Sequence, residues 1–273
     1  MEIKGKIAVV TGAGSGIGQA VALDLARRGV KGVGLVDRGA DPLQDTLHKL
    51  SDLPAPHPTA LPLIGDTTDP TFRRHAYDEI ERKCGVVGIC VPAAGITRDA
   101  LGVKLDKTTG KASVYPEETF RLVVEVNLVA PVYWALEMVA RIAEDRHRRG
   151  IGRWQAEENV QGTAIFIGSV SSQGNKGQIA YAATKSGLEG AARTLMKEAM
   201  FYGVRCGLIH PGFTDTPMVR ALGPEYVRKN ILPFTQLGRL IKPEEIADGI
   251  CFLIANSAVS GELWADAGWH PSA

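Results

Sequence analysis

The stretch IAVVTGAGSGIGQAVALDLARR, residues 7–28, decides the fold. It begins with a β-branched run, passes through closely spaced glycines, and ends in an amphipathic segment of helical period. The glycines fit the spacing G-x-x-x-G-x-G through Gly12, Gly16 and Gly18, and they fit G-x-G-x-x-G in no register. Glycine permits a tight turn with close backbone approach, and the following helix N-terminus presents free N–H groups. The stretch therefore predicts a strand, a phosphate-binding loop and a helix.

The remainder of the chain repeats this alternation. Strand-like runs occur at residues 33–36, 60–64, 86–91, 163–167, 204–209 and 262–265. Helix-length segments occur at residues 42–50, 70–83, 117–145, around Tyr181, and at 243–255. Alternating strands and helices favour a parallel sheet covered on both faces, with right-handed crossovers. We expect an α/β fold, a doubly wound Rossmann-like parallel sheet in a single domain spanning residues 1–273, with ligands at the carboxyl ends of its strands.

Composition restricts the class of protein. The chain has 273 residues, 45% of them hydrophobic and 22% charged, with a net charge of +1. So small a charge disfavours nucleic acid or an anionic membrane as partner, and we interpret the basic run at residues 146–149 as a solvated helix end. Neither a signal-type segment nor an apolar run of ~18 residues is evident, so a cytoplasmic protein is expected. The four cysteines are Cys84, Cys90, Cys206 and Cys251. Their spacing is not typical of metal ligands, so we predict buried free thiols and expect no metal site.

Three irregular segments interrupt the pattern, at residues 100–115, 148–162 and 212–233. The third is too long for a plain connection and partly apolar, so it is a candidate substrate lid. Its larger apolar side chains could line a pocket for an acyl chain or an alicyclic ring, or could pack on the core or a neighbouring subunit. These side chains are Phe213, Met218, Val219, Leu222, Tyr226, Ile231 and Phe234.

Two acidic residues follow the second and third strands. Asp37 lies nineteen residues after Gly18, where a carboxylate can accept hydrogen bonds from an adenosine ribose diol. The same carboxylate would repel a 2′-phosphate, which favours NAD(H) over NADP(H), although the guanidinium of Arg38 could instead pair with a phosphate. Asp66 could reach the adenine edge or cap the helix that follows it.

A phenol and an amine share one face of a predicted helix. Tyr181 and Lys185 are four residues apart. A phenol titrates near pH ~10, and a nearby ammonium can lower its pKa by roughly 1–3 units, which suggests an acid/base group for a carbonyl or an alcohol. Ser169 directly follows the strand TAIFIG and could hydrogen-bond the same substrate oxygen. Ser171 or Ser172 could also take that role.

With these motifs in this order, the chain resembles the short-chain dehydrogenase/reductase family over essentially its full length. Residues 95–99 (GITRD), 211–218 (PGFTDTPM) and 238–248 (GRLIKPEEIAD) are similar to the 3-oxoacyl-thioester reductase branch. The excursions before Pro116 and Gly162 are similar to the NAD-linked 3-hydroxyacyl-CoA dehydrogenase branch.

The resemblance implies a catalytic set. Tyr181 would be the acid/base, Lys185 would hold the nicotinamide ribose, and Ser169 would polarise the substrate oxygen. Asn127 would hold a helix kink and a water that relays protons toward the lysine. The cofactor positions implied by the resemblance are Gly12, Ser15, Gly16, Ile17, Gly18, Asp37, Asp66, Gly95, Tyr181, Lys185, Pro211 and Thr216.

Two departures from the family pattern stand out. The family's N-N-A-G after the fourth strand reads PAAG at residues 92–95, so the asparagines that tie the central sheet together are missing and stability must come from elsewhere. The interval from Ser169 to Tyr181 is twelve residues, one fewer than usual.

The function expected from all this is hydride transfer between a nicotinamide and a secondary alcohol or ketone. A 3-oxoacyl or 3-hydroxyacyl thioester, carried by acyl carrier protein or CoA, is the first choice of substrate. A cyclic, steroid or polyol substrate, and a non-catalytic NAD(H) sensor, are the alternatives. Residues 123–142 are apolar over more than one helix face, which together with the family's habit predicts a homotetramer or a dimer.

Overall fold

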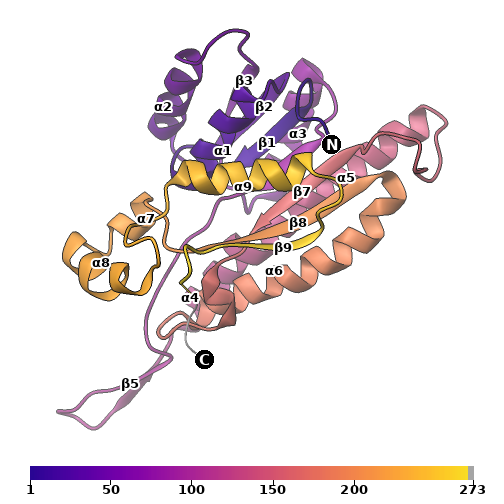
Figure 1. The fold of residues 1–273 in the computed structure, drawn as a ribbon. Coiled ribbons are helices and arrows are strands. Elements are labelled where there is room, and N and C mark those ends of the chain that lie inside the picture. Colours follow the sequence, from indigo (N-terminus) through magenta and orange to yellow (C-terminus); the bar gives the residue numbers. More distant parts are fainter. Residues whose placement is uncertain (270–273) are drawn as a thin grey trace.

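A computed structural model describes residues 1–269 of the chain (Figure 1). Within those residues, seven strands form a parallel sheet in the order β3-β2-β1-β4-β7-β8-β9. The order reverses between β1 and β4, so the crossovers run outward in both directions from the centre. The strands of this sheet are β1 (Ile7–Thr11), β2 (Gly32–Asp37), β3 (Thr59–Ile64), β4 (Ile89–Pro92), β7 (Gly162–Ile167), β8 (Val204–Pro211) and β9 (Gly261–Ala265). The expected doubly wound α/β sheet is confirmed.

Helices cover both faces of the sheet. The larger ones are α1 (Gly16–Arg27), α2 (Ala40–Ser51), α3 (Pro70–Cys84), α4 (Glu117–Val124), α5 (Ala130–Arg148), α6 (Ile179–Glu198) and α9 (Pro243–Ala255). The buried side chains form two clusters, one between the sheet and α1, α2 and α9, the other between the sheet and α3, α5 and α6. In β1, Ala8 and Val10 belong to the first cluster and Ile7 and Val9 to the second, as the two-residue period of a strand requires.

The predicted long helix begins at Glu117 and continues to Arg148 through a π-helical turn, η1 (Glu125–Val129). It contains an 18-residue window of mean hydropathy 1.5, half of which is buried inside the chain. By length and composition alone such a helix could cross a membrane. Its packing against the sheet, through side chains such as Trp134 and Met138, accounts for the same composition.

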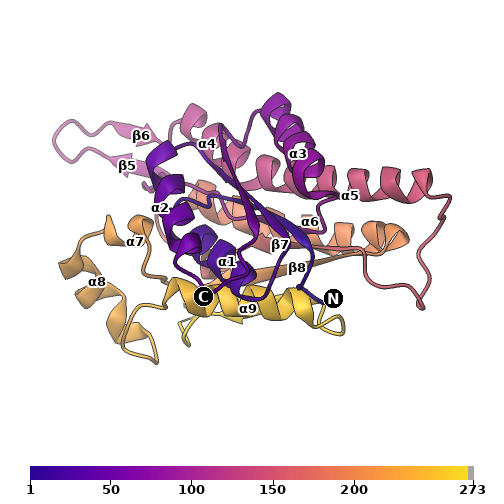
Figure 2. The ribbon, with the colours of Figure 1, turned by 90° about the horizontal axis from the view of Figure 1, so that it is seen from above.

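Two segments project from the end of the molecule where the strands have their carboxyl ends (Figure 2). Residues 100–115 form a hairpin of β5 (Val103–Leu105) and β6 (Ala112–Val114). The predicted lid contains α7 (Pro217–Arg220), α8 (Pro224–Asn230) and a short 3₁₀ turn, η4 (Leu232–Phe234). Two further 3₁₀ turns, η2 (Val170–Gln173) and η3 (Ala199–Tyr202), flank α6.

The basic run at the end of α5 is not uniformly solvated, so that prediction was wrong for Arg146. Its side chain is 1% exposed and its guanidinium donates to both carboxylate oxygens of Glu158, at 2.6 and 3.0 Å. It also donates to the carbonyl of Gly152. A buried guanidinium thus anchors the loop between α5 and β7, a long-range contact that no local pattern reveals.

Candidate active site

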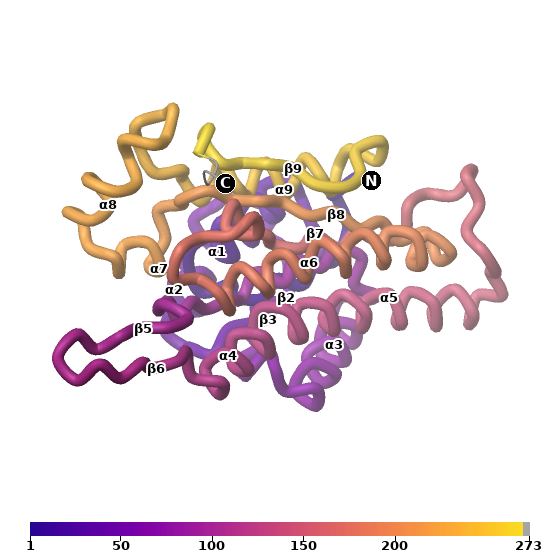
Figure 3. The backbone as a smooth tube through the Cα atoms, turned by 90° about the horizontal axis from the view of Figure 1, so that it is seen from below, coloured from indigo at the N-terminus to yellow at the C-terminus, as the bar shows by residue number. Residues whose placement is uncertain are grey.

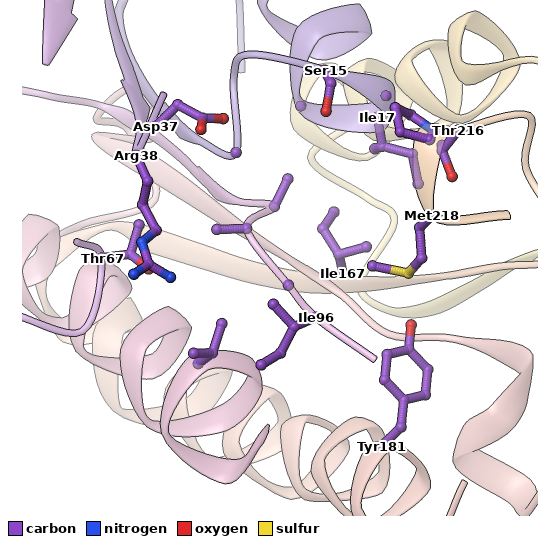
Figure 4. Close-up of a pocket in the computed structure, with 18 of the residues that line it drawn as sticks. Ser15, Ile17, Asp37, Arg38, Thr67, Ile96, Ile167, Tyr181, Thr216 and Met218 are labelled. Carbon is purple, nitrogen blue, oxygen red and sulfur yellow. The ribbon is translucent and has the colours of Figure 1, made fainter. Parts of the chain in front are cut away.

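A cleft of about 380 Å³ runs along the carboxyl ends of the central strands (Figure 4). Asp37 and Arg38 lie at one end of it and Tyr181 at the other, with the glycine loop between them. The predicted residues that line it are Gly12, Ser15, Gly16, Ile17, Gly18, Asp37, Asp66, Gly95, Tyr181, Lys185 and Thr216. The switch in strand order places this cleft where open α/β sheets bind their ligands.

The glycine loop is shaped by close backbone approach. Gly12 and Gly16 have φ of +66° and +55°, a conformation that favours glycine. A Cβ on Gly18 would lie 2.2 Å from the carbonyl oxygen of Gly12, and one on Gly12 would lie 2.9 Å from the backbone of Ala94. Ser15 caps α1 without a side-chain hydrogen bond to the helix among the described residues, so the N–H groups of the first turn remain available. The loop therefore fits a pyrophosphate.

The acidic end of the cleft is organised around Asp37. Its carboxylate accepts from the N–H of Gly14 at 3.0 Å and of Gly39 at 3.2 Å, which fixes its orientation. Arg38 lies 3.5 Å from the Asp66 carboxylate. Hydrogen bonds from Thr68, together with the charge of Arg38, hold the pKa of Asp66 below its usual value.

Asp66 does not cap the helix that follows, so that alternative was wrong. The cap of α3 is Asp69, whose side chain accepts from the N–H of Thr71 at 2.7 Å. Asp66 instead closes a turn with Thr68 and faces the cleft.

The phenol and the amine of α6 both reach the cleft. The Tyr181 hydroxyl points into it, toward Met218 and Ile167 in Figure 4. Lys185 is buried, and its Nζ donates to the carbonyl of Ile167 at 2.7 Å while lying 5.4 Å from the centre of the Tyr181 ring. Both residues thus lie on one face of α6, as their spacing predicts.

Ser169 follows β7, as predicted, and completes this group. Its hydroxyl hydrogen-bonds Tyr181 and accepts from the N–H of Ser171 at 3.1 Å. Ser171 also borders the site, whereas Ser172 faces the ring of His210 at 3.5 Å. The contact with Tyr181 favours Ser169 over the two alternatives.

The pKa of the Tyr181 phenol is shifted upward, whereas the sequence-based expectation was a downward shift. Burial raises the pKa of Tyr181 to about 12, and the hydrogen bond with Ser169 only partly offsets this. Burial likewise lowers the pKa of Lys185 to about 8. The expectation considered charge alone, and in the folded chain desolvation outweighs it because both groups are removed from water. At neutral pH Tyr181 therefore holds its proton and can donate it.

Asn127 stands one layer behind the cleft, inside the π-helical turn. Its side chain accepts from the N–H of Ile96 at 2.9 Å and donates to the carbonyl of Ile96 at 2.8 Å. The turn widens the helix at the point where this buried amide reaches across to the chain after β4. Asn127 consequently fixes Gly95 and Ile96, which line the cleft.

The missing asparagines after β4 are partly compensated by a hydroxyl. The N–H of Ala94 donates to Thr11 Oγ1 at 3.1 Å, which ties the end of β4 to the end of β1. Thr11 is 2% exposed, so this bond is shielded from water.

A second cavity of about 90 Å³ adjoins the first at Tyr181 and Met218. Its wall is formed by the Ser169 loop on one side and by the predicted lid on the other, with Phe213, Val219 and Leu222 contributing apolar surface. Its polar members include Asp99 and Gln178, joined by a hydrogen bond of 2.7 Å. Tyr181 therefore lies between a long cleft and a smaller, partly apolar cavity.

One predicted residue does not line the cleft, and some residues that do line the two cavities were not predicted from the sequence. Pro211 is the last residue of β8, adjacent to Gly212 of the second cavity, and is not among the residues lining the cleft. The cleft also includes residues that carry no motif, and Asp99 and Gln178 come together from segments far apart in the sequence. For Asp99, the sequence signal was its place at the end of the GITRD segment that follows β4.

Comparison with known proteins agrees with this geometry. The family model for short chain dehydrogenases matches residues 6–226. The chain is 33% identical over 267 residues to the 3-oxoacyl-(acyl-carrier-protein) reductase of Escherichia coli, covering 96% of each chain. It is 36% identical to the protein of the same name from Pseudomonas aeruginosa, covering 94% of this chain and 93% of that one.

A solved structure described as ribose-5-phosphate isomerase from Brucella melitensis superposes with a TM-score of 0.81 at 26% identity, covering 98% of this chain and 93% of the other. The family match spans most of the chain, including the glycine loop and the Ser169, Tyr181 and Lys185 group. The chain belongs to the short-chain dehydrogenase family and is an oxidoreductase that acts with a nicotinamide cofactor.

Proposed function

We propose that the chain reduces a 3-oxoacyl thioester, carried by acyl carrier protein or CoA, to the 3-hydroxyacyl thioester, with NADH as its preferred cofactor. The observation that carries this proposal is the Tyr181 hydroxyl, which points into the cofactor cleft and also borders the smaller cavity under the lid. The relatives that share 33% and 36% identity are named for such a reaction. The apolar wall from Phe213, Val219 and Leu222 suits an acyl chain.

The residues of the cleft fit a dinucleotide. The loop around Gly16 and the first turn of α1 would hold the pyrophosphate, Asp37 the adenosine ribose, and Lys185 the nicotinamide ribose. When bound, the nicotinamide supplies a hydride to the carbonyl carbon. Asp37 supports NAD(H) because its fixed carboxylate would repel a 2′-phosphate, and the guanidinium of Arg38, which also lines the cleft, is paired with Asp66.

The protein's own contribution is a positioned proton donor. Tyr181 is protonated at neutral pH, so its O–H can transfer a proton to the substrate oxygen as charge develops there. Ser169 Oγ already accepts from a backbone N–H, and its own hydrogen can be donated to the same substrate oxygen. Lys185 and the Asn127 turn hold the surroundings of this group in place.

A substrate panel tests the proposal. We expect acetoacetyl thioesters of CoA and acyl carrier protein to give a higher kcat/KM than a cyclic ketone or a ketose, and NADH to exceed NADPH, in an absorbance assay of the reduced cofactor. Tyr181→Phe should lower kcat by about 10²–10⁴-fold while NADH binding, followed by fluorescence titration, is retained. Tyr202→Phe, in η3 and outside both cavities, is the matched control and should leave kcat unchanged.

Two results would contradict this function. Turnover of the Tyr181→Phe variant near the wild-type rate would remove the acid/base role. Preference for a cyclic ketone or a ketose over both thioesters would instead keep the chemistry and overturn the substrate class.

A further inference from the structure

A buried histidine lies behind the Ser169 loop, outside the site described above. His210, on β8, is fully buried and stacks on the indole of Trp264, with ring centres 4.0 Å apart and planes at 11°. Two carboxylates face its Nε2, Glu189 from α6 and Glu262 from β9. None of His210, Glu189 and Glu262 is among the residues lining the two cavities of the site.

The surroundings of the ring determine its tautomer. His210 Nδ1 lies 3.1 Å from the carbonyl oxygen of Ser169, which can only accept, so Nδ1 carries the hydrogen. Nε2 is buried and makes no hydrogen bond within the described part of the chain. In the neutral ring its lone pair faces carboxylate oxygens of Glu262 at 3.4 Å and Glu189 at 3.9 Å. The Arg193 guanidinium balances the two carboxylates, but it leaves the buried Nε2 itself without a hydrogen-bond partner among the described residues, which is unfavourable.

The spacing of one donor pair, His210 Nε2 and Glu262, suits a metal ion better than a shared proton. An imidazolium that donates to a carboxylate does so at about 2.7–2.9 Å, shorter than the distance to either glutamate. Nitrogen and oxygen ligands at about 2.0–2.2 Å from a tetrahedral Zn²⁺ lie roughly 3.3–3.5 Å apart, which matches the 3.4 Å between His210 Nε2 and Glu262. The distance from His210 Nε2 to Glu189 is longer, 3.9 Å, so the Glu189 side chain would move inward to join the ion, and the three donor atoms all lie within 4.8 Å of one another.

We propose that Glu189, His210 and Glu262 form a site for a divalent transition-metal ion of the Zn²⁺ type. The Nδ1–H bond to the Ser169 carbonyl is the second interaction that metal-bound histidines commonly make, since it fixes the ring and its tautomer. The ion would connect α6, β8 and β9 and would support the Ser169 loop from behind. None of the three residues lines the two cavities, so the ion would act on the position of the loop that carries Ser169 and would not contact the substrate.

Arg193 is the natural competitor for this place. Its guanidinium lies 2.5 Å from Glu262 and 3.7 Å from Glu189, so it pairs with the same carboxylates. The side chain is 61% exposed and can turn outward into water when an ion binds. If the cluster binds a metal ion, removal of Arg193 should therefore favour binding. If the cluster is only a network of ion pairs, the same change should weaken it.

Calorimetric titration of the full chain with ZnCl₂, after treatment with a chelator and without nicotinamide, tests the site. We expect the wild type to bind one ion, and His210→Gln and Glu262→Gln to bind it at least about tenfold more weakly. Arg193→Ala should bind it more tightly. Glu198→Gln, an exposed position near the end of the same helix as Glu189, is the control and should match the wild type.

Anomalous diffraction at the zinc edge should then place the ion beside His210 Nε2. If His210→Gln fails to fold, the partly exposed Glu262 and Arg193 still supply the comparison. Equal affinity in the wild type and Glu262→Gln, weaker binding by Arg193→Ala, or zinc bound elsewhere on the chain would each overturn the proposal.

Discussion

At the scale of single residues, the chemistry depends on two groups that burial pushes in opposite directions. Removal from water disfavours the charged form of each, so the Tyr181 phenol keeps its proton and the Lys185 amine loses it more readily. A spacing of four residues in the amino-acid sequence indicates that the two groups share a helix face. It does not indicate whether that face is buried. The sequence-based expectation of a lowered phenol pKa was wrong for this reason.

The stability of the ligand-free chain should report the buried amine. The pKa of Lys185 is about 8 in the folded chain and 10.5 in its ordinary environment. Below pH 8 the amine is charged in both folded and unfolded chains, and the folded chain bears the full cost of burying that charge. Between about pH 8 and 10.5 the folded chain releases the proton while the unfolded chain retains it, so the stability of the folded chain rises with pH.

We therefore predict that the free energy of unfolding of the wild type, minus that of Lys185→Met, increases by roughly 2–3 kcal/mol from pH 7 to pH 10. Urea denaturation at several pH values measures it. Lys197→Met, exposed on the same helix, is the control for the loss of a lysine from α6. A pH-independent difference for Lys185→Met would show that the amine is not desolvated.

At the scale of elements, the hairpin and the loop after α5 look alike in sequence and differ in what they contact. The hairpin side chains Val103, Leu105 and Val114 are 63%, 59% and 74% exposed. The N–H of Tyr115 donates to the carbonyl of Gly102 at 2.9 Å, so the two ends of the hairpin already meet. The loop after α5, in contrast, supplies Glu158 to the buried Arg146.

Replacement of residues 103–114 by two glycines should change the free energy of unfolding by less than about 1 kcal/mol, because exposed side chains contribute little. Glu158→Ala is the comparison and should cost roughly 1–3 kcal/mol, since it leaves a buried charged donor without its partner. Chemical denaturation monitors both variants. A large loss on removing the hairpin would mean that its apolar face is covered in the folded protein.

The same contrast explains how far the sequence could predict this protein. Local patterns were sufficient for β1, the glycine loop and α6, because a run such as IAVV can form little else when a glycine turn and a helix follow it. The burial of Arg146 depends on how the irregular loop after α5 folds back on its helix, and the pairing of Asp99 with Gln178 joins segments 79 residues apart. His210 was missed for that reason too: its partners Glu189 and Glu262 come from other elements, so no local spacing marks the cluster.

At the scale of the whole molecule, the long helical segment of α4 and α5 leaves several large apolar side chains partly exposed. Figure 3 shows α5 and α6 side by side, and Tyr133 and Leu136 on α5 are 50% and 38% exposed. Leu122 on α4 is 46% exposed. Several exposed apolar side chains on one helical segment suit an association site, and most such assemblies of identical chains are twofold pairs. We therefore predict a homodimer or homotetramer in solution.

Sedimentation velocity at micromolar concentration measures this assembly. The wild type should sediment as a multiple of the 29.2 kDa chain, and the double variant Tyr133→Glu with Leu136→Glu should shift toward the single chain, because each glutamate would be buried without a partner. Leu105→Glu, exposed on the hairpin and away from this helical segment, is the matched control and should keep the wild-type mass. A wild-type mass of one chain would contradict the prediction. Retention of the assembly by the double variant would instead place the contact elsewhere, with the edge strand β9 and the half-exposed Phe252 of α9 as the next surface to test.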